Sequence, residues 1–125
     1  MDINSYVNFN DFEGLDYLTE RFSKHLKELR EYTQTSILTM GKTIKMPFQS
    51  IARYEKGKTE PSISNAYKIA SYFFMSLEDF IFQNDVISLF EKNIKKLCSF
   101  APNKNIDICK ERFPHIDIVK LIYSL

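Results

Sequence analysis

The amino-acid sequence predicts an all-α fold. Apolar residues recur every three or four positions over most of the 125 residues, as they do on one face of an amphipathic helix. Only three Gly and four Pro residues are present, so few turns are expected, and Ser, Asn or Asp precedes several apolar runs at the position of a helix N-cap. These three features indicate a series of helices joined by short connections.

The composition restricts the class of protein. Apolar residues make up 44% of the chain and charged residues 26%, which is typical of a soluble globular domain. No apolar run approaches the ~18 residues of a membrane-spanning helix, and the N-terminus lacks the basic and apolar regions of a secretory signal. We therefore expect a cytoplasmic protein without membrane contact. Cys98 and Cys109 fit no metal-binding spacing and are expected to be buried free thiols, so no metal or other cofactor is predicted.

A first amphipathic helix is predicted over residues 11–32, with Asn10 or Asp11 as its N-cap. Gly14 offers an alternative, in which a short acidic lead helix ends before the main one begins. Five of the six charged residues in 1–21 are acidic, so we expect this stretch to be an acidic lead segment. The apolar stripe of the helix consists of Phe12, Leu15, Leu18, Phe22, Leu26 and Leu29.

Two short helices with a tight connection come next. Ser36 is a suitable N-cap for a helix over residues 37–43. Pro47 is tolerated at the first position of a helix, which then runs over residues 47–55 until Gly57 ends it. Only three or four residues separate the two helices, so we expect them to pack against each other.

The small and apolar residues of these two helices are spaced as a packed pair requires. Gly41 lies where a bulky side chain would push the two helix axes apart. Polar residues alternate with the apolar ones and are left facing outward. The shared core is expected to consist of Met40, Ile44, Met46, Ile51 and Tyr54.

Two further helices complete a five-helix unit that we place at residues 22–82. The loop after the helix over 47–55 combines Gly and Pro, the strongest turn signal in the chain, and Ser62 caps a helix that reaches about Phe73. Ser76 begins a capping-box pattern that opens a fifth helix toward Phe82.

Residues 83–125 are predicted to form additional C-terminal helices. Asn84 or Asp85 can cap a helix whose apolar stripe ends at Leu97, and Pro102 marks a break after it. Short helices are favoured for the remainder, although a strand is also open. We expect this segment to serve dimerisation or to bind a protein partner, because its apolar stripe needs a partner surface; the alternative is that it extends the core of the monomer. The stripe consists of Val86, Leu89, Phe90, Ile94 and Leu97.

Positive charge gathers in residues 42–58, although the whole chain has a net charge of only +1. Five basic residues in this stretch face a single acid, Glu55. A polyanion is a candidate ligand for such a patch. A solvated lysine-rich face is the alternative interpretation.

The helix over residues 47–55 carries side chains suited to reading DNA bases. Gln49 and Arg53 are four residues apart and so share one face. In the major groove of B-DNA, Arg binds the two acceptors of guanine and Gln pairs with adenine. Phe48 contacts a thymine methyl group or, alternatively, serves as a core or interface aromatic, and Ser50 lies close by.

Several short segments together resemble the phage repressor and Cro-type helix-turn-helix family, also called XRE. The resemblance covers about residues 22–80 and implies a five-helix repressor-like domain and binding of double-stranded DNA by a homodimeric transcription repressor at an operator. The segments are Leu29-Arg30-Glu31, Ile51-Ala52-Arg53-Tyr54-Glu55-Lys56-Gly57-Lys58, Pro61-Ser62-Ile63, Lys68-Ile69-Ala70 and Ser76-Leu77-Glu78-Asp79-Phe80.

The resemblance also implies roles for individual residues. It makes residues 36–55 the helix-turn-helix and implies a salt bridge between Arg30 and Glu55, whose loss leaves an unpaired charge at a cost on the order of 3 to 5 kcal/mol if the pair is buried. Base reading falls to Phe48, Gln49, Ser50 and Arg53. Phosphate contacts fall to Ser36 and Lys58, and in the basic stretch between them to Lys45 and Lys56.

Four positions depart from the family pattern. Ile37 replaces a Gln that starts the second helix, and Phe74 replaces a Gly after the fourth. Lys45 replaces the Gly of the turn, so either this residue adopts the left-handed conformation or the turn differs. Pro47 occupies a usual cap position and shifts the cap to Met46.

The sequence favours no enzyme. Asp11, Glu13, Asp16 and Glu20 form an acidic face without a converging base or nucleophile. His25 and His115 have no partner spacing for catalysis or metal binding, and no P-loop or nucleophile-elbow motif is present. The competing hypothesis to a DNA-binding regulator is a helix-turn-helix scaffold that binds protein, such as an antitoxin or an inhibitor of a defence enzyme.

Overall fold

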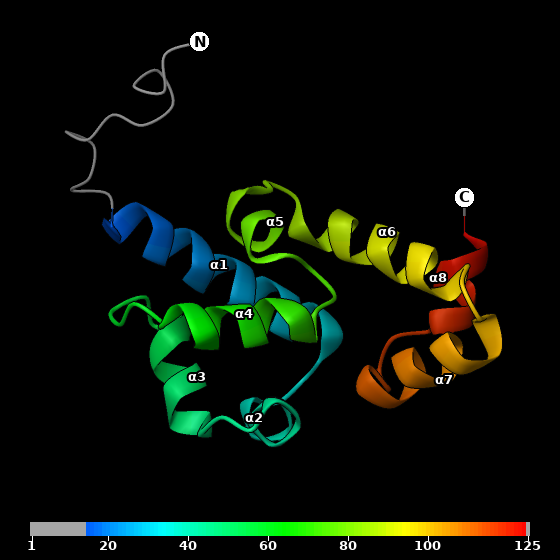
Figure 1. Cartoon of the computed structure of the whole chain (residues 1–125), viewed down its shortest axis with the longest axis horizontal. Coiled ribbons are helices and arrows are strands. Elements are labelled where there is room, and N and C mark those ends of the chain that lie inside the picture. The colour runs from blue at the N-terminus through cyan, green and yellow to red at the C-terminus, as the bar shows by residue number, and fades with distance from the viewer. Residues whose placement is uncertain (1–14, 125) are drawn as a thin grey trace, which may run out of the picture.

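The computed structural model describes residues 15–124, which form eight α-helices and no strand (Figure 1). The predicted all-α class is therefore confirmed. The expectations for residues 1–14, including the start of the first helix and the effect of Gly14, lie outside the described residues. The helices are α1 (Leu15–Thr33), α2 (Ile37–Ile44), α3 (Phe48–Glu55), α4 (Ile63–Tyr72), α5 (Leu77–Phe82), α6 (Val86–Cys98), α7 (Pro102–Arg112) and α8 (Ile118–Tyr123).

Side-chain caps begin most of these helices, as the sequence predicted. Ser36, Ser62 and Ser76 each accept a hydrogen bond from the backbone N–H three residues further on, at 3.0 to 3.1 Å. Of the two candidates before α6, Asp85 is the residue that caps the helix, at 3.1 Å. Each cap satisfies one of the free N–H groups of the first turn, which stabilises the helix by about 1 kcal/mol.

The start of α3 differs from the prediction. Pro47 is the N-cap of α3 and not its first helical residue, because its ψ of 132° is extended, and Met46 is therefore not the cap. The cap makes no side-chain hydrogen bond, because the side chain of proline has no polar atom. The alternative of a strand within residues 106–125 is wrong for the described residues, because α7 continues to Arg112 and α8 covers Ile118–Tyr123.

Two residues adopt the left-handed conformation at positions where glycine is usual. Lys45 has a φ of 56° after α2, and Phe74 has a φ of 58° after α4. Each costs about 1 to 2 kcal/mol compared with glycine. The turn between α2 and α3 therefore keeps the geometry that a glycine would give, in spite of the substitution.

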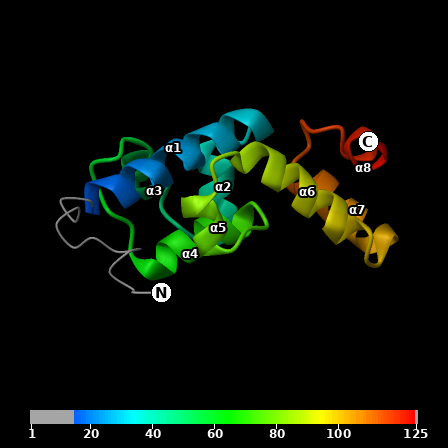
Figure 2. The ribbon, with the colours of Figure 1, turned by 90° about the horizontal axis from the view of Figure 1, so that it is seen from above.

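The C-terminal helices share one hydrophobic core with the five helices before them. Phe73, the C-cap residue of α4, lies where the C-terminal helices meet the first five. Its ring centroid is 6.3 Å from that of Phe80 and 6.1 Å from that of Phe113. Phe90 of α6 meets Phe113 edge to face at 5.0 Å. Figure 2 shows α6, α7 and α8 gathered at the end of the molecule away from the N-terminus of α1.

The apolar stripe of α6 is covered by its own chain. Phe90 and Ile94 have no exposed surface, and Leu89 and Leu97 are partly buried. The stripe therefore needs no second chain, because α1, α7 and α8 pack against α6. The expectation that it does was wrong. Its burial agrees with the alternative of an extended monomer core. A role of residues 83–125 in association stays a prediction that depends on other side chains.

Two buried pairs of polar groups help to join the helices. Cys98 and Cys109 are free, buried thiols with Sγ atoms 3.8 Å apart, and burial raises the pKa of Cys109 to about 12. His25 of α1 donates from Nδ1 to the carbonyl of Phe80 at 2.6 Å.

Every helix within residues 15–124 is too short or too polar to span a membrane.

Candidate nucleic-acid interface

Helices α2 and α3 approach each other at Gly41. A Cβ atom added at this position would lie 2.5 Å from the carbonyl oxygen of Met46 in the connecting turn, which is closer than real Cβ contacts. Of the five apolar residues expected between the two helices, Ile44 is only partly buried and the other four are buried, namely Met40, Met46, Ile51 and Tyr54. The position of α3 relative to α2 is therefore set by the absence of a side chain at Gly41.

The inner side of α3 is anchored to α1 and α4. Ile51 and Tyr54 point into the core. Asn65 of α4 donates from Nδ2 to the Tyr54 hydroxyl at 2.8 Å, and Ser23 of α1 donates from its hydroxyl to the carbonyl of Glu55 at 2.5 Å. Each bond joins α3 to a different helix, so α3 is held at its C-terminal turn from two directions.

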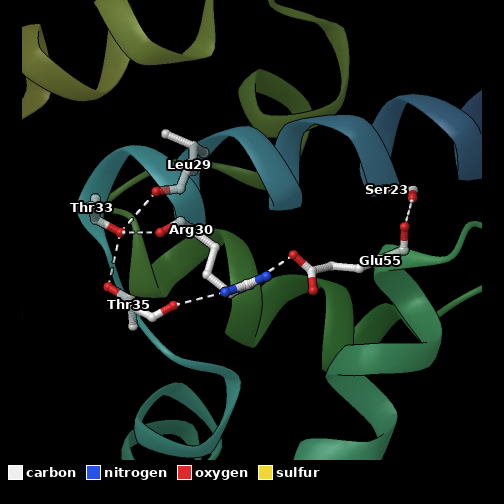
Figure 3. Close-up of polar contacts among 6 residues, drawn as sticks. All are labelled: Ser23, Leu29, Arg30, Thr33, Thr35 and Glu55. Atoms are coloured by element: carbon white, nitrogen blue, oxygen red, sulfur yellow. Dashed lines mark hydrogen bonds and ion pairs between the residues drawn. The ribbon is translucent and has the colours of Figure 1, made fainter.

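An ion pair ties the end of α1 to the last turn of α3 (Figure 3). Arg30 donates from Nε to Glu55 Oε1 at 2.7 Å, and both side chains are largely buried, at 25% and 13% exposed. The pair is not bidentate, because Nη1 of Arg30 donates instead to the carbonyl of Thr35 at 3.2 Å. Arg30 thus links α3 both to α1 and to the segment that leads into α2.

The residues predicted to read bases lie on the exposed part of α3. At 100° per residue, Gln49 and Arg53 fall opposite the buried Ile51, and both are exposed. Phe48 and Ser50 lie on the flanks of this face. Phe48 is 43% exposed, so it is not a core residue of this chain.

One hydrogen bond orders the side chains of this face. Arg53 donates from Nη2 to the hydroxyl of Ser50 at 3.3 Å. The bond uses one of the five N–H donors of the guanidinium. A bidentate contact with an acceptor outside the chain therefore remains sterically and chemically possible for Arg53.

The basic residues around α3 keep their positive charge uncompensated. Lys45, Lys56 and Lys58 are exposed, and within residues 15–124 neither they nor Arg53 form an ion pair. Glu55, the single acid of this stretch, is occupied by Arg30. The surface next to α3 therefore attracts anions.

Ser36, the remaining predicted phosphate contact, is exposed but already bonded. Its oxygen accepts from the backbone N–H of Thr39 at 3.0 Å, and its hydroxyl donates to Thr39 Oγ1 at 2.9 Å. An anion beside Ser36 would meet the other free N–H groups at the start of α2.

Several residues that position α3 were not predicted from the sequence. Ser23 and Asn65 bond to residues 32 and 11 positions away along the chain, and no motif links such polar side chains to their partners. Thr33 was not predicted either. Its hydroxyl bonds to the carbonyl of Leu29 at 2.8 Å and to the hydroxyl of Thr35 at 2.8 Å, and so it orders the segment between α1 and α2 (Figure 3). In the described part of the chain, no three His, Cys, Asp or Glu side chains gather as metal ligands would.

Comparison with known proteins agrees with this geometry. A helix-turn-helix family model matches residues 26–80, from the middle of α1 through α5. The chain is similar to a protein of Methanocaldococcus jannaschii described as an uncharacterized HTH-type transcriptional regulator, with 36% identity over 63 residues. This similarity covers 50% of the chain and 91% of the relative. No solved structure matches the chain.

Proposed function

The chain belongs to the XRE-type helix-turn-helix family, and on this premise we propose that it is a sequence-specific DNA-binding transcriptional regulator, a repressor that reads an operator through α3. The family and its regulator relative support a DNA-binding regulator in general. One observation carries the finer proposal. Helix α3 is fixed from behind by Arg30 and Ser23, while Gln49 and Arg53 are exposed on its other side.

Four side chains on the outer side of α3 have different roles at the DNA: Phe48, Gln49 and Arg53, which are exposed, and Ser50, which is half-buried. Arg53 binds the two acceptors of guanine, and Gln49 pairs with the acceptor and donor of adenine. Phe48 contacts a thymine methyl group at the edge of the same face. Ser50 orients Arg53 through the hydrogen bond between their side chains.

Phosphates of the DNA backbone lie beside the flanks of α3 in this proposal. Lys45 is in the turn before α3, and Lys56 and Lys58 are in the segment after it, so the three charges bracket the helix. Ser36 lies beside a further phosphate at the start of α2. Such contacts fix the orientation of the protein without selecting a sequence.

We also propose a division of labour along the chain and association into a homodimer. Residues 22–82 bind DNA, residues 1–21 are an acidic lead segment before this domain, and residues 83–125 contribute to the dimer or bind a protein partner. A dimer places two copies of α3 one turn of DNA apart, ~34 Å. Apolar side chains of this segment that the chain leaves exposed can form such an interface, among them Val119 and Tyr123. Light scattering at micromolar concentration tests the dimer, and a monomer under these conditions contradicts it.

The salt dependence of binding tests the proposal against a protein-binding module. The equilibrium constant for a DNA ligand, selected from random sequence, is measured by fluorescence anisotropy at several salt concentrations. We expect a linear loss of log K with log salt, whose slope falls by about 1 in Lys58→Ala because one phosphate contact is removed.

The matched control is Lys92→Ala, which removes an exposed charge from α6 and should leave the slope unchanged. If the wild-type protein shows no preference for the selected DNA over random DNA, the regulator proposal fails and the protein-binding alternative is favoured.

A further inference from the structure

We infer that a groove between α2, α4 and α7 binds a phosphate group. The groove is separate from the exposed face of α3 and has a volume of about 220 Å³. Figure 1 shows the C-terminal end of α7 directed toward α2 and α4. The residues that supply polar groups to it are Thr43, Tyr67, Lys68, Ser71 and Arg112.

The charge of the groove is positive and unbalanced. Lys68 and Arg112 line it together with four hydroxyl-bearing residues, of which Tyr72 is buried, and no carboxylate does. Within residues 15–124, neither Lys68 nor Arg112 forms an ion pair. Two basic side chains with hydroxyl donors beside them are suited to an anion.

Arg112 is held in place by neutral partners. Its guanidinium lies 4.7 Å from the ring centroid of Phe74 and 5.4 Å from that of Tyr72. Nη1 donates to the carbonyl of Tyr72 at 3.3 Å. Two aromatic faces and a carbonyl fix the orientation of the guanidinium without neutralising its charge. Binding of an anion therefore costs little conformational entropy at this side chain.

The left-handed Phe74 is part of this arrangement. A glycine at this position would avoid the unfavourable φ of 58°, but it would also remove the ring beneath Arg112. The strained conformation is thus compensated by a contact that positions the guanidinium. Arg112 belongs to α7, outside the residues 26–80 that the family model matches, so the groove is a property of this chain and not of the shared domain.

The size of the groove limits the ligand. Pockets for drug-sized molecules usually exceed ~300 Å³, so this groove suits a single phosphate or pyrophosphate group. Such a group can belong either to a free phosphorylated molecule or to the DNA backbone. Both sources present the same chemistry to Lys68 and Arg112.

The location of the groove couples the C-terminal helices to the helix-turn-helix. Thr43 is in the last turn of α2, next to the left-handed Lys45 that leads into α3. A phosphate bridging Thr43, Lys68 and Arg112 would join α2, α4 and α7 at one point. Occupancy of the groove would then bias the position of α2 and, through the turn, of α3.

Thermal unfolding of the full chain with pyrophosphate tests the site without DNA, so the outcome does not depend on the proposed function. Ionic strength is held constant with chloride. Because phosphate ions stabilise proteins in general, the measured quantity is the difference between variants. We expect pyrophosphate to raise the Tm of the wild type, and Lys68→Met to weaken the apparent affinity by about tenfold or more, as loss of a charge-assisted hydrogen bond does.

Lys104→Met is the control, since Lys104 is an exposed lysine of α7 that does not line the groove. It should respond to pyrophosphate as the wild type does. If Lys68→Met and Lys104→Met respond equally, or if pyrophosphate raises the Tm no more than chloride, the inferred site is wrong. Lys68 is exposed, so its replacement is compatible with folding.

DNA binding by Lys68→Met then distinguishes the two sources. If the phosphate belongs to DNA, the salt slope falls by about 1 relative to the wild type. If it belongs to a free molecule, the slope is unchanged, and pyrophosphate alters the DNA affinity of the wild type but not that of Lys68→Met. Either result identifies the source of the phosphate, whereas the site itself is tested by the difference in Tm response between Lys68→Met and Lys104→Met.

Discussion

Helices α3 and α6 are both amphipathic, but their two faces are used differently. In α6, the buried face with Phe90 and Ile94 packs on the same chain and contributes to the core that joins the C-terminal helices to the domain. In α3, the buried face is small, yet an ion pair and two hydrogen bonds fix it, while Gln49 and Arg53 stay uncovered. Helix α6 therefore stabilises the molecule, whereas α3 is positioned to present side chains.

The largest expected effect concerns the core that α6 helps to form. Phe113→Ala removes a fully buried ring that touches both Phe73 and Phe90, and we expect the free energy of unfolding to fall by about 3 to 5 kcal/mol. Urea denaturation followed by circular dichroism measures this loss. A single transition is expected, because the two regions share one core.

Phe100→Ala provides the control for that substitution. Phe100 is 65% exposed, so its removal should change the free energy of unfolding by less than ~1 kcal/mol. Equal effects of the two substitutions, or separate unfolding of the C-terminal helices, would show that α6 to α8 do not stabilise the domain.

The anchoring of α3 should have the next largest effect. Glu55→Ala leaves Arg30 without its partner in a largely buried position, and we expect a loss of about 1.5 to 3 kcal/mol in the free energy of unfolding. The exposed pair of Lys24 and Glu28, at 3.9 Å, serves as the control. Glu28→Ala should cost less than ~1 kcal/mol, and a loss as large as that of Glu55→Ala would contradict the anchoring role.

The close approach of α2 and α3 is tested at Gly41. Gly41→Ala places a methyl group against the Met46 carbonyl, so the turn must shift, at a cost of about 1 to 3 kcal/mol. Lys42→Ala, at the exposed neighbouring position, should leave stability within ~0.5 kcal/mol of the wild type. Chemical denaturation compares the two, and a neutral or stabilising effect of Gly41→Ala contradicts the observed contact.

The smallest effect is a dependence of stability on pH. Burial lowers the pKa of His25 below its usual 6.5, although the bond to the Phe80 carbonyl partly opposes this. The unfolded chain therefore binds a proton more readily than the folded chain does. The stabilisation from neutral His25 is complete above pH 6.5 and is lost as the pH falls from there toward the lowered pKa.

Tm measured between pH 7.5 and pH ~5.5 checks this dependence. His25→Gln should flatten the decline, since glutamine has no charge to acquire, whereas the same change at exposed His115 should not. An undiminished decline in His25→Gln contradicts the assignment.

The sequence predicted those parts of the fold that depend on local chemistry. Serine caps, the glycine after α3 and the apolar spacing of α2 and α3 each act within a few residues, so the pattern reveals them. Proline before α3 was predicted to be the first helical residue, because its fixed φ suits that position, but its extended ψ makes it the N-cap instead. The partner of the α6 stripe could not be predicted, because an apolar face can be covered by its own chain or by another.

The candidate site was predictable to a similar extent. The spacing within α3 indicated Gln49 and Arg53, which the structure places on one exposed face. Ser23 and Asn65 were not predictable, because the contacts that make them important exist only after α1, α3 and α4 have packed.

Selection of bound sequences from random DNA by the wild type and by Arg53→Ala, with Lys92→Ala as control, tests whether α3 reads DNA through Arg53. We predict that the wild type and Lys92→Ala select the same sequence, with a guanine contacted by Arg53. Arg53→Ala should lose preference at that position while weak nonspecific binding survives. If Arg53→Ala selects the same sequence as the wild type, α3 does not read the DNA through Arg53 and the proposal is wrong.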